Sequence, residues 1–256
     1  MIEAKNFDCI NNVYYLTPKE LSFSDVYISV RDKEHRFLSD KEVMKLPFCS
    51  LENPHYKEWV LRQKSTKRFI NYLELKKEEL NILDIGCGNG WFTSHIANTS
   101  SKNKVIGLDI NVDELEQASR IFNQENVQFV YGDIYNLDPI FKNKINLIVL
   151  NASIQYFSNF PKLITLLKRF LKPNGEIHII DSPFYNESDI EKAKQRTKDY
   201  YSKLGFPIMS LNYFHHKKTD IQDFKVMYRP KSFILSKVSK EDSPFMWLCY
   251  DKKINF

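Results

Sequence analysis

Glycine is scarce in this sequence. The chain has seven glycines in 256 residues, whereas average usage of about 7% would give roughly eighteen. Because glycine costs backbone entropy on folding, we expect it where the backbone bends sharply or approaches a ligand closely. Three of the seven, Gly86, Gly88 and Gly90, nevertheless fall close together. This cluster is the first candidate for a binding site.

Paired cysteines and long apolar runs are absent. The four cysteines form no CxxC pair, which argues against a structural zinc site and against a disulfide framework. We therefore expect a reduced, cytoplasmic compartment and no bound metal. Apolar stretches such as Ile145–Leu150 are far shorter than the roughly 20 residues that cross a bilayer. The first residues lack the basic start and apolar run of a secretory signal, so neither secretion nor a membrane partner is expected.

Charge of one sign is not concentrated either. Lysine and arginine number 37 against 32 acidic residues, a net charge of +5 that lies in residues 186–256. No block has the length of a basic tail, so the pattern favours a solvated helix face and gives no strong nucleic-acid signal. The hydrophobic fraction of 43% is enough to bury a core, and the length suits one large domain.

From residue 81 onward, strand-like and helical patterns alternate. The expected strands are Asn81–Ile85, Lys104–Leu108, Val127–Tyr131, Ile145–Leu150 and Glu176–Asp181, with helices at Trp91–Ala97, from Asn111 to about Asn123, and from Pro161 to Leu171. Such alternation predicts a parallel sheet covered on both faces. A charged helix at Glu187–Leu204, a one-turn helix near Thr219 and two closing strands, Phe224–Arg229 and Phe245–Asp251, follow.

The first 80 residues read differently. Pro54–Leu73 has a helical pattern, and Ser39-Asp40-Lys41-Glu42 fits a capping box that starts a short helix. Asp25–Val30 alternates enough to predict a short strand.

The run Leu83–Trp91, LDIGCGNGW, places the glycines between a strand and a helix, where an open α/β sheet binds ligands. Its spacing is G-x-G-x-G. A dinucleotide fingerprint needs G-x-G-x-x-G, which would put the third glycine at Trp91, so a nicotinamide oxidoreductase is disfavoured. Asp109 ends the second strand, where a carboxylate can accept both hydroxyls of a ribose. Asp133 ends the third strand, where it can accept from an adenine amino group.

Together with that run, the segments VIGLDIN, FVYGDI, INLIVLNASIQYF and LLKRFLKPNGEIHIID resemble, in order, the motifs of class I S-adenosylmethionine-dependent methyltransferases. The resemblance covers roughly residues 80–185. It implies a Rossmann-like, seven-stranded, mostly parallel sheet with helices on both faces. Residues 1–80 would then be a helical segment covering the acceptor side, and residues 81–256 the methyltransferase domain, with an inserted cap after the fifth strand at about 184–218.

The resemblance also implies roles for single residues toward the cofactor, S-adenosyl-L-methionine, and its product, S-adenosyl-L-homocysteine. Asp84 and the loop residues Gly86, Cys87, Gly88 and Gly90 would hold the methionine end, Asp109 with Ile110 the ribose, Asp133 with Ile134 the adenine, and Asn151 would lie near the methionine moiety.

Specialised branches of the family fit poorly. The sequence Asn151-Ala-Ser-Ile154 lacks the Asp/Asn-Pro-Pro-aromatic run of DNA amino-methylating enzymes, and no Pro-Cys dipeptide exists for a cytosine-C5 enzyme. Metal-dependent catechol-type enzymes need Asp where this chain has Asn151. By elimination we expect transfer to an O, N or C atom of a small-molecule acceptor. Methylation of RNA or protein and a non-catalytic cofactor-binding module remain alternatives, and the oligomeric state is open.

The acceptor pocket should be built from residues that overhang the cofactor. The candidates are Gln155 and Tyr156, Asp181 and Tyr185, the helix near Tyr56–Arg62, and the segment Asn212–His216. Because the connection leaving the fifth strand starts on the ligand side of the sheet, we predict His215 or His216 as the proton-accepting group, with Tyr156 and Asp181 next in line. A reaction that needs no base remains an alternative. His178, inside the fifth strand, is expected to be structural.

Overall fold

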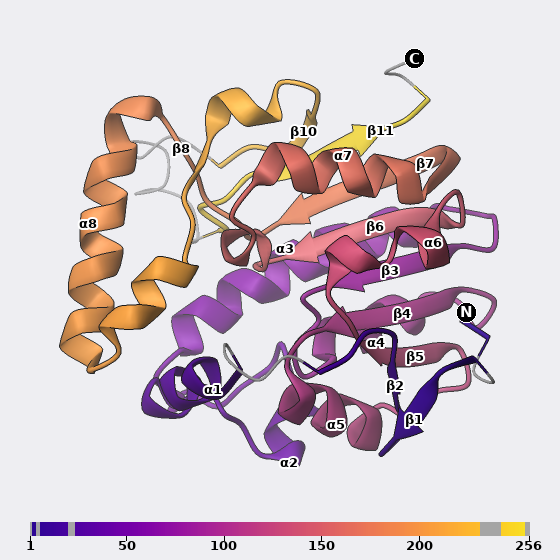
Figure 1. Cartoon of the computed structure of the whole chain (residues 1–256), viewed down its shortest axis with the longest axis horizontal. Coiled ribbons are helices and arrows are strands. Elements are labelled where there is room, and N and C mark those ends of the chain that lie inside the picture. The colour runs from indigo at the N-terminus through magenta and orange to yellow at the C-terminus, as the bar shows by residue number, and fades with distance from the viewer. Residues whose placement is uncertain (1, 4–5, 20–23, 231–241, 254–256) are drawn as a thin grey trace.

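A mixed sheet forms the centre of the protein. The computed structural model describes residues 2–3, 6–19, 24–230 and 242–253 (Figure 1). The predicted strands are β3 (Asn81–Ile85), β4 (Lys104–Asp109), β5 (Val127–Tyr131), β6 (Ile145–Asn151), β7 (Leu171–Ile180), β10 (Lys225–Tyr228) and β11 (Trp247–Asp251). They lie in the order β5-β4-β3-β6-β7-β11-β10. All neighbours are parallel except β11, which is antiparallel to both β7 and β10. The predicted α/β, Rossmann-like fold class is confirmed.

The strand count differs from the prediction. A hairpin of β1 (Asp8–Ile10) and β2 (Val13–Tyr15) extends the sheet to nine strands, with β2 parallel to β5. Two strands therefore lie in the segment that was expected to be helical. Each has only three residues, and the turn between them uses left-handed backbone at Asn11 and Asn12. Elements this short carry no usable hydrophobic period.

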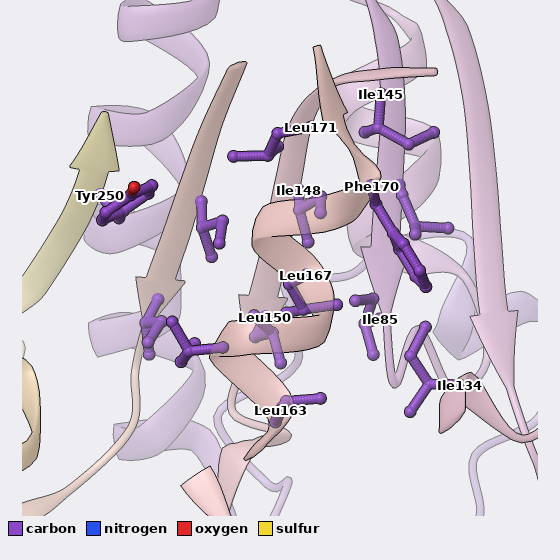
Figure 2. Close-up of a cluster of buried hydrophobic side chains, with 14 of the residues drawn as sticks. Ile85, Ile134, Ile145, Ile148, Leu150, Leu163, Leu167, Phe170, Leu171 and Tyr250 are labelled. Carbon is purple, nitrogen blue, oxygen red and sulfur yellow. The ribbon is translucent and has the colours of Figure 1, made fainter. Parts of the chain in front are cut away.

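Alternate residues of the strands face two helical layers, as period-two side chains require. Ile82 packs with α4 (Trp91–Ala97) and α3 (Tyr56–Glu74). On the same face, α5 (Val112–Ile121) packs on β5. On the other face, Ile85 packs against α7 (Phe160–Phe170) and the short α6 (Asp138–Phe141) (Figure 2). Figure 2 shows Leu167 of α7 beside Leu150 of β6, and Phe170 on the side of Ile85 and Ile134, all within one buried cluster.

The N-terminal region contains three helices. α2 (Asp40–Val43) begins with the predicted capping box, in which the backbone N–H and the hydroxyl of Ser39 both donate to Glu42. α3 lies where the helical pattern predicted it. The strand predicted at Asp25–Val30 is wrong, since these residues belong to α1 (Ser24–Lys33). There Val30 is buried against Tyr201 and Met209, so packing overrides the local β-branched pattern.

The long connection after β7 contains β8 (Phe184–Tyr185), α8 (Glu187–Leu204), η4 (Pro207–Asn212), β9 (His216–Lys217) and η5 (Lys218–Ile221). Gly205 ends α8 in the left-handed conformation, with φ of 96°. In Figure 1, α8 and α1 lie at the same end of the sheet. They touch through the Val30 cluster, and the Tyr200 hydroxyl donates to Glu34 at 2.5 Å. Among the described residues, no helix is long and apolar enough to cross a membrane.

Candidate active site

The loop after β3 lies where the strand order reverses, since β3 is flanked by β4 on one side and by β6 on the other. Ligands of open α/β sheets bind at such a point, outside the carboxyl ends of the strands. Gly86 and Gly88 both have positive φ, 71° and 52°. A Cβ on Gly86 would lie 2.5 Å from Ser153 Cβ, and the Ser153 hydroxyl donates to the Ile85 carbonyl at 2.7 Å. The close approach of the two loops therefore requires glycine at position 86.

Gly90 also has positive φ, 75°, and packing gives it a second reason to be glycine. A Cβ there would meet Ala118 Cβ and the Phe129 ring, each at 2.7 Å, so helix packing accounts for it. Gly90 does not line the cavity described below, and its predicted cofactor contact stays a prediction.

Several parts of the chain line one cavity of about 750 Å³ at this end of the sheet. The lining comes from α1 with the loop after it, the start of α3, the glycine loop, the loops after β6 and β7, α8, and residues 243–245. Of the predicted site residues, the cavity brings together Asp84, Gly86, Cys87, Gly88, Asn151 and Tyr156. Gln155, Asp181 and Tyr185, named as acceptor-pocket candidates, also lie in its wall.

Three carboxyl groups surround the glycine loop. Asp84 is 1% exposed and accepts from the Thr93 hydroxyl at 2.6 Å, and burial raises its pKa to about 7. Asp109 accepts from the backbone N–H groups of Gly88 and Asn111, and burial raises its pKa despite these donors. Burial also raises the pKa of Glu114 to about 7, against the lowering effect of a nearby guanidinium. These buried acids favour a ligand that brings positive charge or hydroxyl donors.

The residues predicted for ribose and adenine lie beside this cavity. Asp109 stands opposite Tyr131 in the sheet, so the ends of β4 and β5 are neighbours. Ile110 is 43% exposed, whereas Ile134 is buried in the core. Asp133 caps the helical turn η2 (Ile134–Asn136), because its carboxylate accepts from Tyr135 N and from the Asn136 side chain. None of these is among the residues that line the cavity, and their predicted contacts stay predictions.

Asn151 provides a direct test of whether the cofactor fits. Its Oδ1 is buried and has no hydrogen-bond donor within the described part of the chain, although it lies in the cavity wall. A buried acceptor without a donor is costly. An ammonium group at this place would satisfy Asn151 Oδ1 and would offset the charge of Asp84. The residues present therefore fit the methionine end of S-adenosylmethionine.

A fourth carboxylate, Asp181, follows β7 at the same edge. The hydroxyls of Ser65 on α3 and of Ser243 donate to its two oxygens, at 2.5 and 2.9 Å. Asp181 and Ala152 both adopt left-handed backbone, with φ of 49° and 54°. Such conformations cost free energy in non-glycine residues and concentrate at functional sites. Burial raises the pKa of Asp181, which moves its titration toward neutrality.

Aromatic rings form the wall nearest α1 and α8. Tyr156, on the turn η3 (Ile154–Tyr156), packs edge-on against Tyr27 at 5.6 Å and against Tyr213 at 6.1 Å between ring centroids. Burial raises the pKa of Tyr156, so its phenol stays protonated near neutral pH and is a poor proton acceptor. The Tyr156 phenol is better suited to donating a hydrogen bond than to the predicted role of proton acceptor.

The two predicted catalytic histidines are neighbours in the sequence, but their side chains have different surroundings. His216 is 5% exposed, packs on Phe160 and bonds through Nε2 to the Ile154 carbonyl, so it is a core residue turned from the cavity. His215 lies behind the wall, with Nε2 2.9 Å from the Thr197 hydroxyl and its ring against Tyr213. Burial lowers the pKa of both histidines. The geometry does not support His216 as a base. His215 is separated from the cavity by Thr197 and Tyr213, which line it.

The sequence analysis missed the contribution of α1. Arg31 and Tyr27 lie in the cavity wall, and Arg31 Nη2 is 3.5 Å from Glu114 Oε1. Glu114 lies over the glycine loop, since its Oε2 would be 3.2 Å from a Cβ on Gly88. A basic residue directly after a segment expected to be a strand, Asp25–Val30, gave no signal for this role.

The described residues contain a second polar cluster, away from the cavity. Glu176, His178 and Cys249 lie close enough to share a metal ion. However, His178 Nδ1 accepts from the Trp247 indole at 3.1 Å, so the proton of a neutral ring is on Nε2, which faces Glu176 at the same distance. That tautomer offers a metal no lone pair, and the expected structural role of His178 fits the cluster better.

Comparison with known proteins identifies the family to which this sequence is similar. Residues 76–225 match the family described as "Methyltransferase domain". The malonyl-[acyl-carrier protein] O-methyltransferase 2 of Ilyobacter polytropus is 35% identical over 124 residues, which are 48% of this chain and 47% of that protein. A tRNA (guanine-N(7)-)-methyltransferase of Clostridium botulinum is 25% identical over 189 residues, 67% of this chain and 81% of that protein. The chain thus spans about half the length of the first curated relatives it matches.

Solved structures agree on the fold. An O-methyltransferase family protein from Burkholderia thailandensis superposes with a TM-score of 0.53 at 11% identity, covering 93% of this chain and 74% of that one. A geranyl diphosphate methyltransferase in complex with GPP and sinefungin superposes with a TM-score of 0.55 at 13% identity, covering 76% and 79%. Identities this low establish the shared fold alone.

Proposed function

The chain belongs to the methyltransferase domain family, and on that premise we propose that it transfers the methyl group of S-adenosyl-L-methionine to a small-molecule acceptor. The observation that carries the proposal is the set of groups gathered at the carboxyl end of β3. Asp84, the Gly86–Gly88 loop and the unpartnered Asn151 oxygen meet there in one cavity. These are the groups that a ligand with an ammonium and a sulfonium charge requires.

A cofactor-binding role for the remaining predicted residues is part of the proposal. Asp109 and Ile110 would contact the ribose, and Asp133 and Ile134 the adenine, because they follow β4 and β5, which lie in that order on one side of β3. Residues 1–80 would cover the acceptor side, and residues 184–218 would form the cap. We also propose a cytoplasmic location, because four free cysteines suit a reducing compartment.

The cofactor supplies an activated methyl group, so the protein mainly has to position the acceptor and receive its proton. We assign proton removal to Asp181 rather than to His215 or His216. Its carboxylate lines the cavity and is held by two serine hydroxyls, and each oxygen keeps a further lone pair for an acceptor. When bound, S-adenosylmethionine would supply the methyl group and keep the electron pair of the S–CH₃ bond on its sulfur, and Asp181 would receive the proton that the acceptor loses.

This assignment favours an acceptor with a hydroxyl or amino group. A carboxylate acceptor is already deprotonated near neutral pH and would be repelled by Asp181. The relatives are named for different acceptors, malonyl-[acyl-carrier protein] and a tRNA guanine, so the proposed acceptor rests on the groups that line this cavity. A cavity of about 750 Å³ is in the range for a small molecule together with the cofactor.

Calorimetric titration with S-adenosylhomocysteine tests the cofactor, with NAD and bulk RNA as comparison ligands. We expect saturable binding of S-adenosylhomocysteine only. Equal binding of NAD would favour an oxidoreductase, and failure to bind S-adenosylhomocysteine would refute the proposed function.

Transfer of a labelled methyl group tests the acceptor. The protein is incubated with methyl-labelled S-adenosylmethionine and a cell extract, which is then divided into small molecules, RNA and protein. Label in the small-molecule fraction supports the proposal, label in RNA or protein selects that alternative, and binding without transfer indicates a non-catalytic module. Asp181→Asn should lower transfer by about 100-fold, whereas His216→Ala should lower it only as far as it destabilises the fold.

A further inference from the structure

Arg31 on α1 is an unusual cation in the cavity wall. Its Nε is buried and has no hydrogen-bond partner among the described residues. Its ion pair with Glu114 is 3.5 Å long, whereas charge-assisted hydrogen bonds are about 2.7–2.9 Å. The guanidinium also lies 5.7 Å from the centre of the Tyr27 ring, but a ring face and one long ion pair leave most of its five N–H donors without an acceptor among the described residues. A buried donor without an acceptor calls for an explanation.

Two other arginines in the same wall differ in this respect. Arg36 donates to both oxygens of Glu58, at 3.2 and 2.6 Å, and Arg62 donates to Glu58 at 3.0 Å. Glu34 also lies 3.3 Å from Arg36, so two carboxylates match the two arginine charges within the protein. Among the described residues Arg31 has no such two-point partner, and the geometry of its planar fork matches a carboxylate or a phosphate.

The charges around Arg31 narrow the choice of ligand. Asp84, Asp109 and Glu114 concentrate negative charge at the glycine loop, and Arg31 lowers the pKa of both Asp109 and Glu114. A ligand that enters this place needs positive charge for the acids and negative charge for the guanidinium. An amino-acid moiety, with an ammonium and a carboxylate on one carbon, meets both requirements.

We propose that Arg31 binds the α-carboxylate of the cofactor's methionine moiety, so that α1 completes a cofactor site begun by the loop after β3. This inference rests on the proposed function. It also gives a role to a helix outside residues 76–225, the range that matches the family. The ammonium then lies toward Asp84 and Asn151, and Glu114 keeps its place over Gly88.

The test compares two ligands that differ by one group. S-adenosylhomocysteine has the carboxylate, and its decarboxylated analogue keeps the amine and lacks only that carboxylate. Both are titrated calorimetrically into the wild-type protein, Arg31→Met and the control Lys33→Met, which removes an exposed cation from the same helix. Arg196→Met serves as a second control, since Arg196 is an exposed cation in the wall of the same cavity.

We expect the wild-type protein and both controls to bind S-adenosylhomocysteine about 10- to 100-fold more tightly than the decarboxylated analogue. Arg31→Met should bring the two ligands within about twofold of each other, chiefly by weakening S-adenosylhomocysteine. An unchanged preference in Arg31→Met, or its loss in Arg196→Met instead, would overturn the proposal and direct the carboxylate elsewhere. The wild-type comparison needs no variant, so equal affinities there also overturn it even if Arg31→Met does not fold.

The outcomes separate this inference from the proposed function. If the wild-type protein binds S-adenosylhomocysteine and only the role of Arg31 fails, the methyltransferase proposal stands. If neither ligand binds the wild-type protein, both proposals fall.

Discussion

Two buried polar clusters lie on this sheet, and they differ in how well their groups are partnered. At β7 and β11, Glu176 accepts from Tyr72, Lys76 and His178, and His178 also accepts from Trp247. At the carboxyl end of β3, Asp84 has one side-chain donor, and Asn151 Oδ1 and Arg31 Nε have no partner within the described residues. The first cluster satisfies itself, whereas the second leaves donors and acceptors for something else.

This difference separates a structural network from a binding site more clearly than residue type does. The partnered donors lower the pKa of Glu176 to about 2, whereas burial raises the pKa of Asp84 to about 7. A carboxylate whose charge is matched internally stabilises the fold. One that is buried with few donors is costly to ionise until a ligand supplies them, so stability and binding should respond separately to changes in the two clusters.

The largest expected effect is on ligand binding at the glycine loop. Gly88→Val should lower the affinity for S-adenosylhomocysteine by more than about 100-fold, because its side chain would occupy space at the backbone that approaches the ligand. Gly205→Val is the matched control, since Gly205 also has positive φ but a Cβ there meets nothing within 4 Å. Thermal melts should show a loss of stability for both variants, larger for Gly88→Val because its Cβ would lie 3.2 Å from Glu114 Oε2, and calorimetry should show a loss of affinity for Gly88→Val alone. Normal binding by this variant would remove the loop from the site.

Glu176→Gln should reverse this pattern. The amide offers donors to Lys76 and weakens the bonds from Tyr72 and His178, so we expect unfolding in urea to become easier by about 1–3 kcal/mol. The affinity for S-adenosylhomocysteine should stay within about twofold of the wild-type value. A large loss of affinity at constant stability would show that the two clusters are coupled.

Asp109→Asn should weaken S-adenosylhomocysteine by about tenfold, through loss of charged hydrogen bonds to the ribose. Asparagine is preferable to alanine here, because Asp109 Oδ1 also accepts from the N–H groups of Ile110 and Asn111, and an amide oxygen can still accept these bonds. An affinity equal to that of the wild-type protein would place the ribose elsewhere.

The clusters should also respond oppositely to pH. The folded pKa values of Asp84 and Glu114, about 7, exceed their unfolded values of 3.8 and 4.5, so the folded protein holds protons that the unfolded chain has lost. Their contribution therefore lowers stability as pH rises from about 4 to about 7. Glu176 acts in the other direction: its stabilisation is present above its unfolded pKa of 4.5 and is lost as pH falls toward about 2.

Urea titrations across this range check the signs. We expect Glu114→Gln to flatten the decline above about pH 4 and Glu176→Gln to flatten the acid side. If stability instead rises from about pH 4 to about 7 in the wild-type protein, the pocket carboxyl groups are ionised more easily than their burial indicates.

The smallest expected effect is that of zinc. Because His178 presents a protonated Nε2 and burial raises the pKa of Cys249 to about 12, equimolar Zn²⁺ should leave the melting temperature unchanged. A rise in the melting temperature that Cys249→Ala abolishes would make the second cluster a metal site.

The sequence predicted the central sheet well, because the buried strands β3 to β7 are continuous apolar runs and the helices between them carry clear caps. Asn111 accepts from Glu114 N at the start of α5, as its position indicated. Residues that come together only through tertiary structure were harder. Arg31 enters the cavity wall from α1, directly after the strand that was wrongly predicted at Asp25–Val30, whereas Asp181 was named for the acceptor pocket from its place at the end of the fifth strand. His215 and His216 were chosen for their titration range, but burial against Phe160 and Tyr213 decides their surroundings.

The contact between α1 and α8 has a consequence for the rate of turnover. Within the described residues, these helices meet through the cluster around Val30, Tyr201 and Met209, to which Tyr27 and Leu204 add partly buried contacts, and through the hydrogen bond from Tyr200 to Glu34. Separating them breaks fewer interactions than global unfolding does, so opening should be faster than unfolding. We expect each catalytic cycle to require that opening twice, once to admit the acceptor and once to release the products, and mutations at Val30 should change the dissociation rate of S-adenosylhomocysteine more than its chemistry.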